Sequence, residues 1–254
     1  MSHSGPAPLD GKAVLITGSA RRLGAAMARK LHGAGARIAI HYRSSSADAD
    51  ALVAELNGAR SGSAVALCAD LLDLGSLPGL VAGVVEVFGR LDVLVNNAST
   101  FYPTPVGEIT PAQFDDLVGT NLRAPLFLSQ AAAPQLRLHE GLIINMVDIH
   151  GSRPLKRHPV YSAAKAGLIM LTRSLARELA PKVRVNGIAP GPVMWPEGGV
   201  DPDLQQKILD RTALRRPGSP EDVARAALFF ATEAPYVTGQ VLAIDGGRSL
   251  GGGL

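Results

Sequence analysis

Cysteine is almost absent from this chain, since Cys68 is the only one among 254 residues. A single cysteine cannot form an intrachain disulfide, which excludes a small secreted fold held together by disulfide bonds. Cys68 lies in the apolar run SAVALCAD, so we interpret it as a strand residue rather than a reactive thiol. The cysteine content is therefore compatible with a reducing compartment.

Long hydrophobic runs are also missing. Nowhere do about 18 apolar residues, the length that crosses a bilayer, follow one another. The first twelve residues, MSHSGPAPLDGK, contain no apolar segment of the signal-peptide kind. We expect a soluble, cytoplasmic protein without a membrane partner.

Blocks of like charge are scarce. The net charge is only +3, although the sequence pI is near 9.2, and the basic clusters are as short as Arg215-Arg216. A nucleic-acid footprint normally needs a larger basic patch. The mild excess of base suits a small anionic ligand, and we expect neither a nucleic-acid partner nor a metal ion.

Short apolar runs alternate with longer segments of helical periodicity. With 46% hydrophobic and 19% charged residues, the chain has the composition of a globular protein. Continuously apolar strands indicate a sheet covered on both faces and hence a parallel one, and right-handed crossovers make it doubly wound. The predicted strands are 12–17, 37–42, 63–69, 91–96, 141–147, 183–189 and 241–244, and the predicted helices are 23–35, 47–57, 75–88, 111–136, 160–180 and 220–231.

No linker interrupts this rhythm, so we expect one α/β domain over residues 1–254. Only the stretch 191–219, rich in glycine and proline, breaks the pattern, and it contains a short helical piece around 203–210. It follows the end of a strand, where such sheets bind ligands. We interpret it as a substrate-binding loop.

The segment TGSARRLG, residues 17–24, follows the first strand and opens a helix. Gly18 permits a tight turn and Gly24 allows close packing of helix on strand, so the helix N-terminus faces a phosphate. Arg22 stands where a third glycine usually lies. It is either a solvated surface residue or, as we favour, a contact to phosphate or substrate.

The second strand ends in HYRSSS, residues 41–46. A carboxylate about 20 residues beyond the turn would indicate NAD, and none is present. His41, Arg43 and Ser44 instead form a positive, hydroxyl-bearing end that suits a 2′-phosphate, which predicts NADPH. Asp70 either accepts a hydrogen bond from the adenine amino group or caps the following turn.

Tyr161 and Lys165 stand one helical turn apart in YSAAK, on one face of a predicted helix. A nearby ammonium favours the tyrosinate and brings the proton of the hydroxyl within working range. Asp148 lies thirteen residues before Tyr161, at the end of a strand. By itself, Asp148 reads equally well as a turn former.

Together, these motifs resemble the short-chain dehydrogenase/reductase family across the whole chain. The shared features are TG…G, NNAS at 96–99, Asn121 in TNL, the Tyr-x-x-x-Lys pair and PG at 190–191. The family normally has a serine at the position of Asp148. The chain is more narrowly similar to the pteridine reductase subgroup, in which arginine replaces the middle glycine and aspartate replaces the serine. The segments that carry this similarity are TGSARRLG with Arg22, HYRSS, NNASTFYPTP, NMVD and RVNGIAPGPVMWPE.

The resemblance implies a Rossmann fold and a set of residue roles. Tyr161 would donate a proton, and Lys165 would hold the nicotinamide ribose. Asp148 would form a hydrogen bond with Tyr161 or a water and help relay the proton. Asn121 would support a water chain, Phe101 would stack on a flat pterin opposite the nicotinamide, and Trp195 would either close over the substrate or only pack. We assign to the cofactor Gly18, Arg22, Leu23, Gly24, His41, Tyr42, Arg43, Ser44, Asp70, Asn97, Ala98, Ser99, Lys165, Pro190 and Gly191. We assign to the substrate Arg22, Ser99, Phe101, Asp148, Tyr161 and Trp195.

The implied activity is NADPH-dependent reduction of a 7,8-dihydropterin such as dihydrobiopterin or dihydromonapterin, with dihydrofolate as a further candidate. One alternative is reduction of a carbonyl substrate such as a 3-ketoacyl thioester, which needs only Tyr161 and Lys165. The other is a non-catalytic sensor of NADP(H). The family also implies a homotetramer.

Overall fold

A computed structural model describes residues 7–195 and 198–250 of the chain. Its centre is a sheet of seven parallel strands in the order β3-β2-β1-β4-β5-β6-β7. The strands are β1 (Ala13–Ile16), β2 (Arg37–Tyr42), β3 (Ala64–Cys68), β4 (Val93–Asn96), β5 (Leu142–Met146), β6 (Arg184–Pro190) and β7 (Val241–Ile244). The strand order reverses between β1 and β4, where doubly wound sheets bind their ligands.

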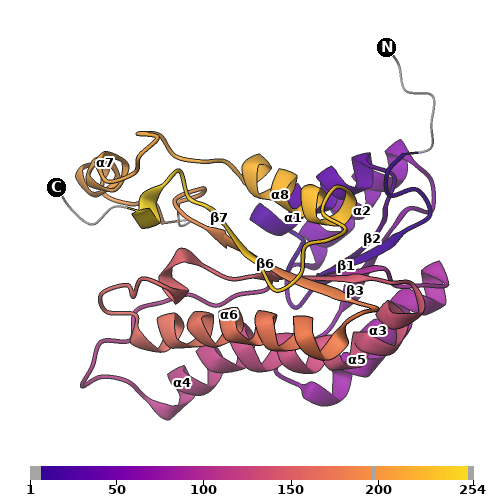
Figure 1. The fold of residues 1–254 in the computed structure, drawn as a ribbon, viewed down its shortest axis with the longest axis horizontal. Helices are drawn as coiled ribbons and strands as arrows, with labels where there is room; N and C mark the ends of the chain where they lie inside the picture. The colour runs from indigo at the N-terminus through magenta and orange to yellow at the C-terminus, as the bar shows by residue number, and fades with distance from the viewer. Residues whose placement is uncertain (1–6, 196–197, 251–254) are drawn as a thin grey trace.

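Helices cover both faces of the sheet (Figure 1). On one face lie α1 (Arg22–Gly33), α2 (Ser46–Ala59) and α8 (Pro220–Thr232). On the other lie α3 (Leu77–Phe88), α4 (Pro111–Val118), α5 (Ala124–Leu138) and α6 (Pro159–Leu179), while α7 (Pro202–Asp210) stands beyond the end of the sheet. Val14 and Ile16 of β1 enter the first apolar layer, and Ala13 and Leu15 enter the second. This alternation explains why the strand is apolar throughout.

The predicted fold class is confirmed, including each strand and the short helix near 203–210. The predicted helix 111–136 differs in detail, because a π-helical segment, Gly119–Arg123, separates α4 from α5. There the N–H of Ala124 donates to the carbonyl of Gly119, five residues earlier. Short 3₁₀ helices at Leu74–Ser76, Ile149–Gly151 and Arg248–Leu250 were not predicted. Residues 196–197 of the predicted loop 191–219 lie outside the described part of the chain.

Asp92 joins the strand ends that lie farthest from the ligand-binding edge. Its buried carboxylate accepts a hydrogen bond from Ala13 N (2.9 Å), a bidentate pair from Arg90 (2.7 and 2.6 Å) and an ion pair from Lys12 (3.1 Å). Burial alone would raise the pKa of Asp92, but these donors lower it. Asp92 therefore holds β1 against β4 as an anion. Of the helices described, none is long and apolar enough to cross a membrane.

Candidate active site

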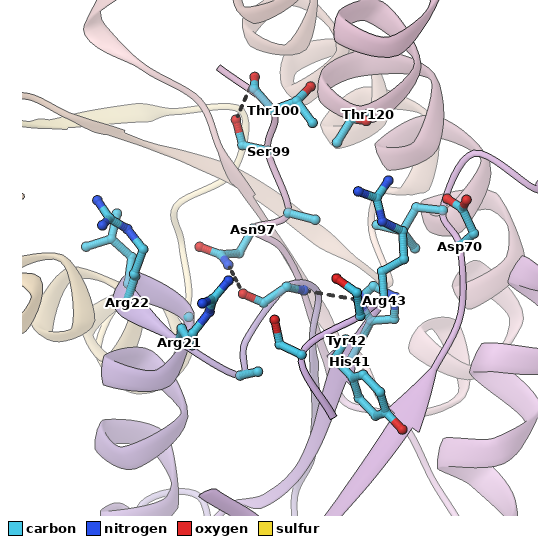
Figure 2. Close-up of a pocket in the computed structure, with 18 of the residues that line it drawn as sticks. Arg21, Arg22, His41, Tyr42, Arg43, Asp70, Asn97, Ser99, Thr100 and Thr120 are labelled. Atoms are coloured by element: carbon cyan, nitrogen blue, oxygen red, sulfur yellow. Dashed lines mark hydrogen bonds between the residues drawn. The ribbon is translucent and has the colours of Figure 1, made fainter. Parts of the chain in front are cut away.

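A cavity of about 400 Å³ opens at the carboxyl ends of β1, β2 and β4 (Figure 2). Twelve of the residues assigned to the cofactor line it: Gly18, Arg22, Leu23, Gly24, His41, Tyr42, Arg43, Ser44, Asp70, Asn97, Ala98 and Ser99. Lys165, Pro190 and Gly191 are not part of this lining. Ala20, Arg21, Ser45, Leu71, Leu72, Thr100 and Thr120 line it without having been predicted. All of these lie within two residues of a predicted one, so a wider window around each motif would have found them.

The turn between β1 and α1 requires its glycines. Gly18 has φ +58°, and a Cβ on Gly24 would lie 2.5 Å from Ser19 Cα. Arg22 also has a positive φ of 56°, which is strained for a residue with a side chain. The chain thus keeps an arginine at the helix N-terminus despite a backbone conformation that favours glycine.

Three arginines face the cavity: Arg21, Arg22 and Arg43. Arg22 Nη2 donates to the carbonyl oxygen of Trp195 at 3.0 Å, which ties the loop after β6 to the turn after β1. The Trp195 side chain is partly buried. Together with the start of α1, these guanidinium groups make the cavity suited to an anion.

His41 does not contribute the positive charge expected of it. Its side chain is 2% exposed, Nδ1 accepts from Gly18 N at 3.0 Å, and Nε2 pairs with Ala69 O at 3.1 Å. Burial lowers the pKa of His41, although the Ala69 carbonyl and Asp70 oppose this effect. Asp70 Oδ1 accepts from Leu72 N at 3.0 Å, as the turn-capping alternative predicts.

Asn97 fastens the end of β4 to the same turn. Its Nδ2 donates to Thr17 O (2.8 Å) and Gly18 O (3.1 Å), and Thr17 Oγ1 accepts from Asn97 N and Ala98 N, both at 2.9 Å. The Asn97 amide group is therefore part of the cavity wall, and its Nδ2 is hydrogen-bonded to the backbone of the glycine turn.

The structure brings Asp148, Tyr161 and Lys165 together. Tyr161 donates its hydroxyl proton to Asp148 Oδ2 at 2.8 Å, while Asp148 Oδ1 accepts from His150 N at 2.8 Å. The buried Lys165 Nζ donates to Met146 O at 2.8 Å and lies 5.6 Å from the centre of the Tyr161 ring.

The pKa values of Tyr161 and Lys165 differ from the prediction that the Lys165 ammonium favours the tyrosinate form of Tyr161. Burial, followed by the charge and hydrogen bond of Asp148, raises the pKa of Tyr161 well above its usual value, against a smaller opposing effect of Ser99. Burial lowers the pKa of Lys165 to about 8, although Asp148 acts in the opposite direction. In this arrangement Tyr161 is a protonated hydroxyl rather than a tyrosinate favoured by Lys165.

Asn121 lies in the π-helical segment and is fully buried. Its Oδ1 accepts from Ser99 Oγ at 2.7 Å, and its Nδ2 donates to Thr100 O (2.9 Å) and Leu117 O (3.0 Å). Asn121 thus fixes the strand-end segment that carries Ser99. π-Helical turns are often found at functional sites.

Phe101 presents an exposed aromatic ring beside Tyr161. It is 49% exposed, and its ring meets that of Tyr161 edge-on, with 4.8 Å between the ring centres. His158 stacks on Phe101 at 4.7 Å with an interplanar angle of 9°. No sequence motif marks His158 for this role.

The site rests on a buried polar chain. Asn96 Nδ2 donates to Asn145 Oδ1 at 2.8 Å, and Asn145 Nδ2 donates to Thr172 Oγ1 at 2.9 Å. These bonds join β4, β5 and α6 below the catalytic group. Among the residues described, no cluster of His, Cys, Asp and Glu could hold a metal ion.

The parallel sheet, the glycine turn and the Tyr–Lys pair define a nucleotide-binding oxidoreductase. A family model described as Enoyl-(Acyl carrier protein) reductase matches residues 18–249. The chain belongs to the short-chain dehydrogenase/reductase family, whose reductases use NAD(P)H and act on small molecules.

Known relatives cover nearly the whole chain. It is 37% identical to Pteridine reductase 1 of Leishmania tarentolae, over 98% of this chain and 99% of that protein. It is 35% identical to the 3-oxoacyl-[acyl-carrier-protein] reductase FabG of Staphylococcus aureus, over 93% and 97%. An uncharacterized oxidoreductase of Methylorubrum extorquens is 36% identical, over 94% and 98%.

Proposed function

We propose that this protein reduces a 7,8-dihydropterin to its tetrahydro form with NADPH, and that dihydrofolate is a second candidate substrate. The observation that carries this proposal is the hydrogen bond from Tyr161 to Asp148, beside the exposed ring of Phe101. A serine at the position of Asp148 suffices in the general family pattern. The pteridine reductase subgroup that the sequence resembles has aspartate at this position, and the exposed Phe101 ring offers a flat ligand a stacking surface.

The residues around the cavity fit NADPH. The glycine turn leaves room where a Cβ would collide, and Arg21 and Arg22 flank the N-terminus of α1, which suits a pyrophosphate. Arg43, Ser44 and Ser45 lie where β2 leads into α2, and they suit the 2′-phosphate. When bound, NADPH supplies the hydride.

Tyr161 is the proton donor in this proposal. Reduction requires a protonated hydroxyl at the start of turnover, and the raised pKa of Tyr161 keeps it protonated at neutral pH. Asp148 accepts the hydrogen bond that orients the hydroxyl, and relays the proton that replaces the one donated. Lys165 lies on the same helix face as Tyr161, and its Nζ donates to Met146 O. In this position Lys165 binds the nicotinamide ribose.

Phe101 supplies the stacking surface for the pterin. A flat heteroaromatic ring gains about 0.5–1.5 kcal/mol from an offset stack beyond its buried area. His158 stacks on one face of the Phe101 ring, and the 49% exposure of Phe101 leaves further ring surface for such a ligand. Its edge contact with Tyr161 brings the ligand's ring close to the proton donor.

Reduction of a 3-ketoacyl thioester is the second candidate, because a 3-oxoacyl-[acyl-carrier-protein] reductase is 35% identical over 93% of the chain. That reaction uses Tyr161 and Lys165 but gives Asp148 and Phe101 no part. The identities to the two kinds of reductase, 37% and 35%, are nearly equal, so the preference for the pterin rests on Asp148 and Phe101.

A substrate panel separates these candidates. Purified protein is assayed for NADPH oxidation with dihydrobiopterin, dihydromonapterin, dihydrofolate and a 3-ketoacyl thioester. We expect turnover of at least one pterin and little with the thioester. Failure to turn over any pterin would overturn the proposal.

Tyr161→Phe serves as the matched variant for catalysis. It should bind NADPH like the parent and lose pterin reduction by about 10²–10⁴-fold, the usual range for a general acid. If it keeps the protein's cellular role while losing the reaction, a non-catalytic NADP(H) sensor becomes the better explanation.

We also propose a homotetramer. Phe114 of α4, Phe127 of α5 and Met170 of α6 are 50%, 36% and 58% exposed, respectively. The helices α4, α5 and α6 lie on the same side of the sheet (Figure 1). Exposed apolar side chains on neighbouring helices suit a subunit interface. Light scattering after size exclusion gives the mass, and a monomer at working concentration would contradict this assembly.

A further inference from the structure

His41 connects three segments that form the floor of the cavity. Nδ1 accepts from Gly18 N (3.0 Å), in the turn after β1, and Nε2 lies 3.1 Å from Ala69 O, after β3. The backbone carbonyl of His41 also accepts from Ser19 N at 3.0 Å. His41 is labelled in Figure 2 among the residues that line the cavity. One residue of β2 thus fixes two successive amides of the glycine turn.

These contacts define the protonation state of the ring. A backbone N–H can only donate, so Nδ1 must carry a lone pair, and a backbone carbonyl can only accept, so Nε2 must carry the hydrogen. Only the neutral Nε2–H tautomer meets both conditions. A second proton, on Nδ1, would face the Gly18 N–H and break that bond.

We propose that neutral His41 is a positioning residue, which holds the Gly18 turn in the shape that receives the cofactor phosphates, and that protonation of its ring releases this turn. The proposal rests on the assignment of the cavity to a nicotinamide dinucleotide. His41 touches no ligand in this role, because its 2% exposed ring is engaged below the cavity surface.

The surroundings favour the neutral ring. Burial lowers the pKa of His41 and outweighs the opposing Ala69 carbonyl and Asp70. The charged groups that share the cavity are Asp70 after β3, Arg43 at the end of β2, and Arg21 and Arg22 at the start of α1. Since an unfolded histidine has a pKa of about 6.5, protons favour the unfolded chain as pH falls below that value, until the lower folded pKa is reached.

Three substitutions test the two contacts of the His41 ring separately. His41→Asn keeps an acceptor at the position of Nδ1 and cannot titrate, His41→Gln keeps a donor near Nε2, and His41→Leu keeps neither. At pH 8 we expect His41→Asn to bind NADPH within about threefold of the parent. We expect His41→Gln and His41→Leu to bind at least about tenfold more weakly, which corresponds to about 1.4 kcal/mol.

His32 provides the matched control. It is also buried and has a lowered pKa, but its Nε2 pairs with Ser63 Oγ at 2.7 Å, near the C-terminal end of α1 and away from the cavity. His32→Leu should lower the melting temperature like His41→Leu and leave the Kd for NADPH unchanged. Equal weakening by both variants would mean that lost stability explains the effect, and would overturn the proposal.

The pH dependence is measured with NADH as well as NADPH, because a 2′-phosphate itself titrates near pH 6. As the pH is lowered from 8 over the range in which circular dichroism shows a folded chain, parent affinity for NADH should fall while that of His41→Asn stays level. Parallel curves, or equal affinities of the Asn and Leu variants at pH 8, would refute the role of His41. If the parent binds neither dinucleotide at pH 8, the cofactor assignment itself fails.

Discussion

Replacing Asp148 with asparagine removes one negative charge from the proton-donating group and changes little else. Asp148 Oδ1 accepts from His150 N, and the asparagine oxygen can retain that bond. The new amide N–H group would then face Tyr161 Oη, where Asp148 Oδ2 now accepts at 2.8 Å. An acceptor that opposes ionisation of the tyrosine becomes a donor that favours it.

The size of the effect follows from that separation. Two unit charges 2.8 Å apart repel by about 6 kcal/mol at an effective dielectric constant of about 20, and by about 1.5 kcal/mol in bulk water. Asp148 is partly exposed, so we expect about 2–3 kcal/mol. At about 1.4 kcal/mol per unit, the pKa of Tyr161 should fall by about two units in Asp148→Asn.

Tyrosinate absorbance measures this ionisation directly. The titration of Tyr161→Phe is subtracted from that of each protein, which isolates Tyr161 among the four tyrosines. The alkaline limb of pterin reduction should also move to lower pH, because Lys165 loses the charge that raises its own pKa. Binding of NADPH should stay unchanged.

A second tyrosine–aspartate pair gives the control. Tyr102 donates to Asp116 at 2.9 Å, and burial, together with this bond, raises the pKa of Tyr102 to about 12. Asp116→Asn should leave the titration of Tyr161 and the reaction unchanged. An Asp148→Asn protein that is folded and titrates like the parent would refute the reasoning.

Four further outcomes are expected. Phe101→Ala should raise the KM for a pterin about tenfold and leave the Kd for NADPH unchanged, and an unchanged KM would remove Phe101 from the substrate site. Arg43→Asp should narrow the preference for NADPH over NADH in paired binding titrations, since it replaces a phosphate partner with a repulsive charge; an unchanged ratio would count against the 2′-phosphate assignment. Arg22→Gly should raise stability by about 1 kcal/mol in urea unfolding, because it relieves the positive φ of 56°, while it weakens NADPH binding; lower stability would show that its contacts outweigh the strain. Asp92→Asn should lower the free energy of unfolding by about 2 kcal/mol at pH 7. Because the folded pKa of Asp92 is lowered, this loss of stability should shrink as the pH falls below about 4. A loss of stability that does not depend on pH would contradict the ionic role of Asp92.

The sequence predicted what depends on local pattern. The apolar strands, the glycine turn and the helical spacing of Tyr161 and Lys165 each have a short-range cause, and the structure contains all of them. The hydrogen bond between Asp148 and Tyr161 followed from a spacing of thirteen residues and a resemblance. These features can be predicted from local geometry or from the order of the motifs along the chain.

Features that depend on packing between distant segments were less predictable. In the sequence HYRSSS, His41 is predicted to be a basic residue. Only in the folded chain is its ring buried and hydrogen-bonded to Gly18 N and Ala69 O, which favours the neutral form. The raised pKa of Tyr161 likewise results from desolvation, which no motif encodes. The stacking of His158 on Phe101 joins two loops of the chain that no sequence spacing connects.

The π-helical segment Gly119–Arg123 absorbs one extra residue between α4 and α5. A π-helical turn corresponds to one extra residue in an α-helix, and each residue of an α-helix turns by about 100°. The bulge takes up that angle locally, so deleting one residue here would restore a regular α-helix and leave the buried Leu128, Ala132 and Leu136 of α5 in the core. Across homologous genes, we therefore expect one-codon deletions in this segment to be rare for a local reason, because losing the extra residue would displace Asn121 from Ser99 and Thr100 while the packing of α5 is kept.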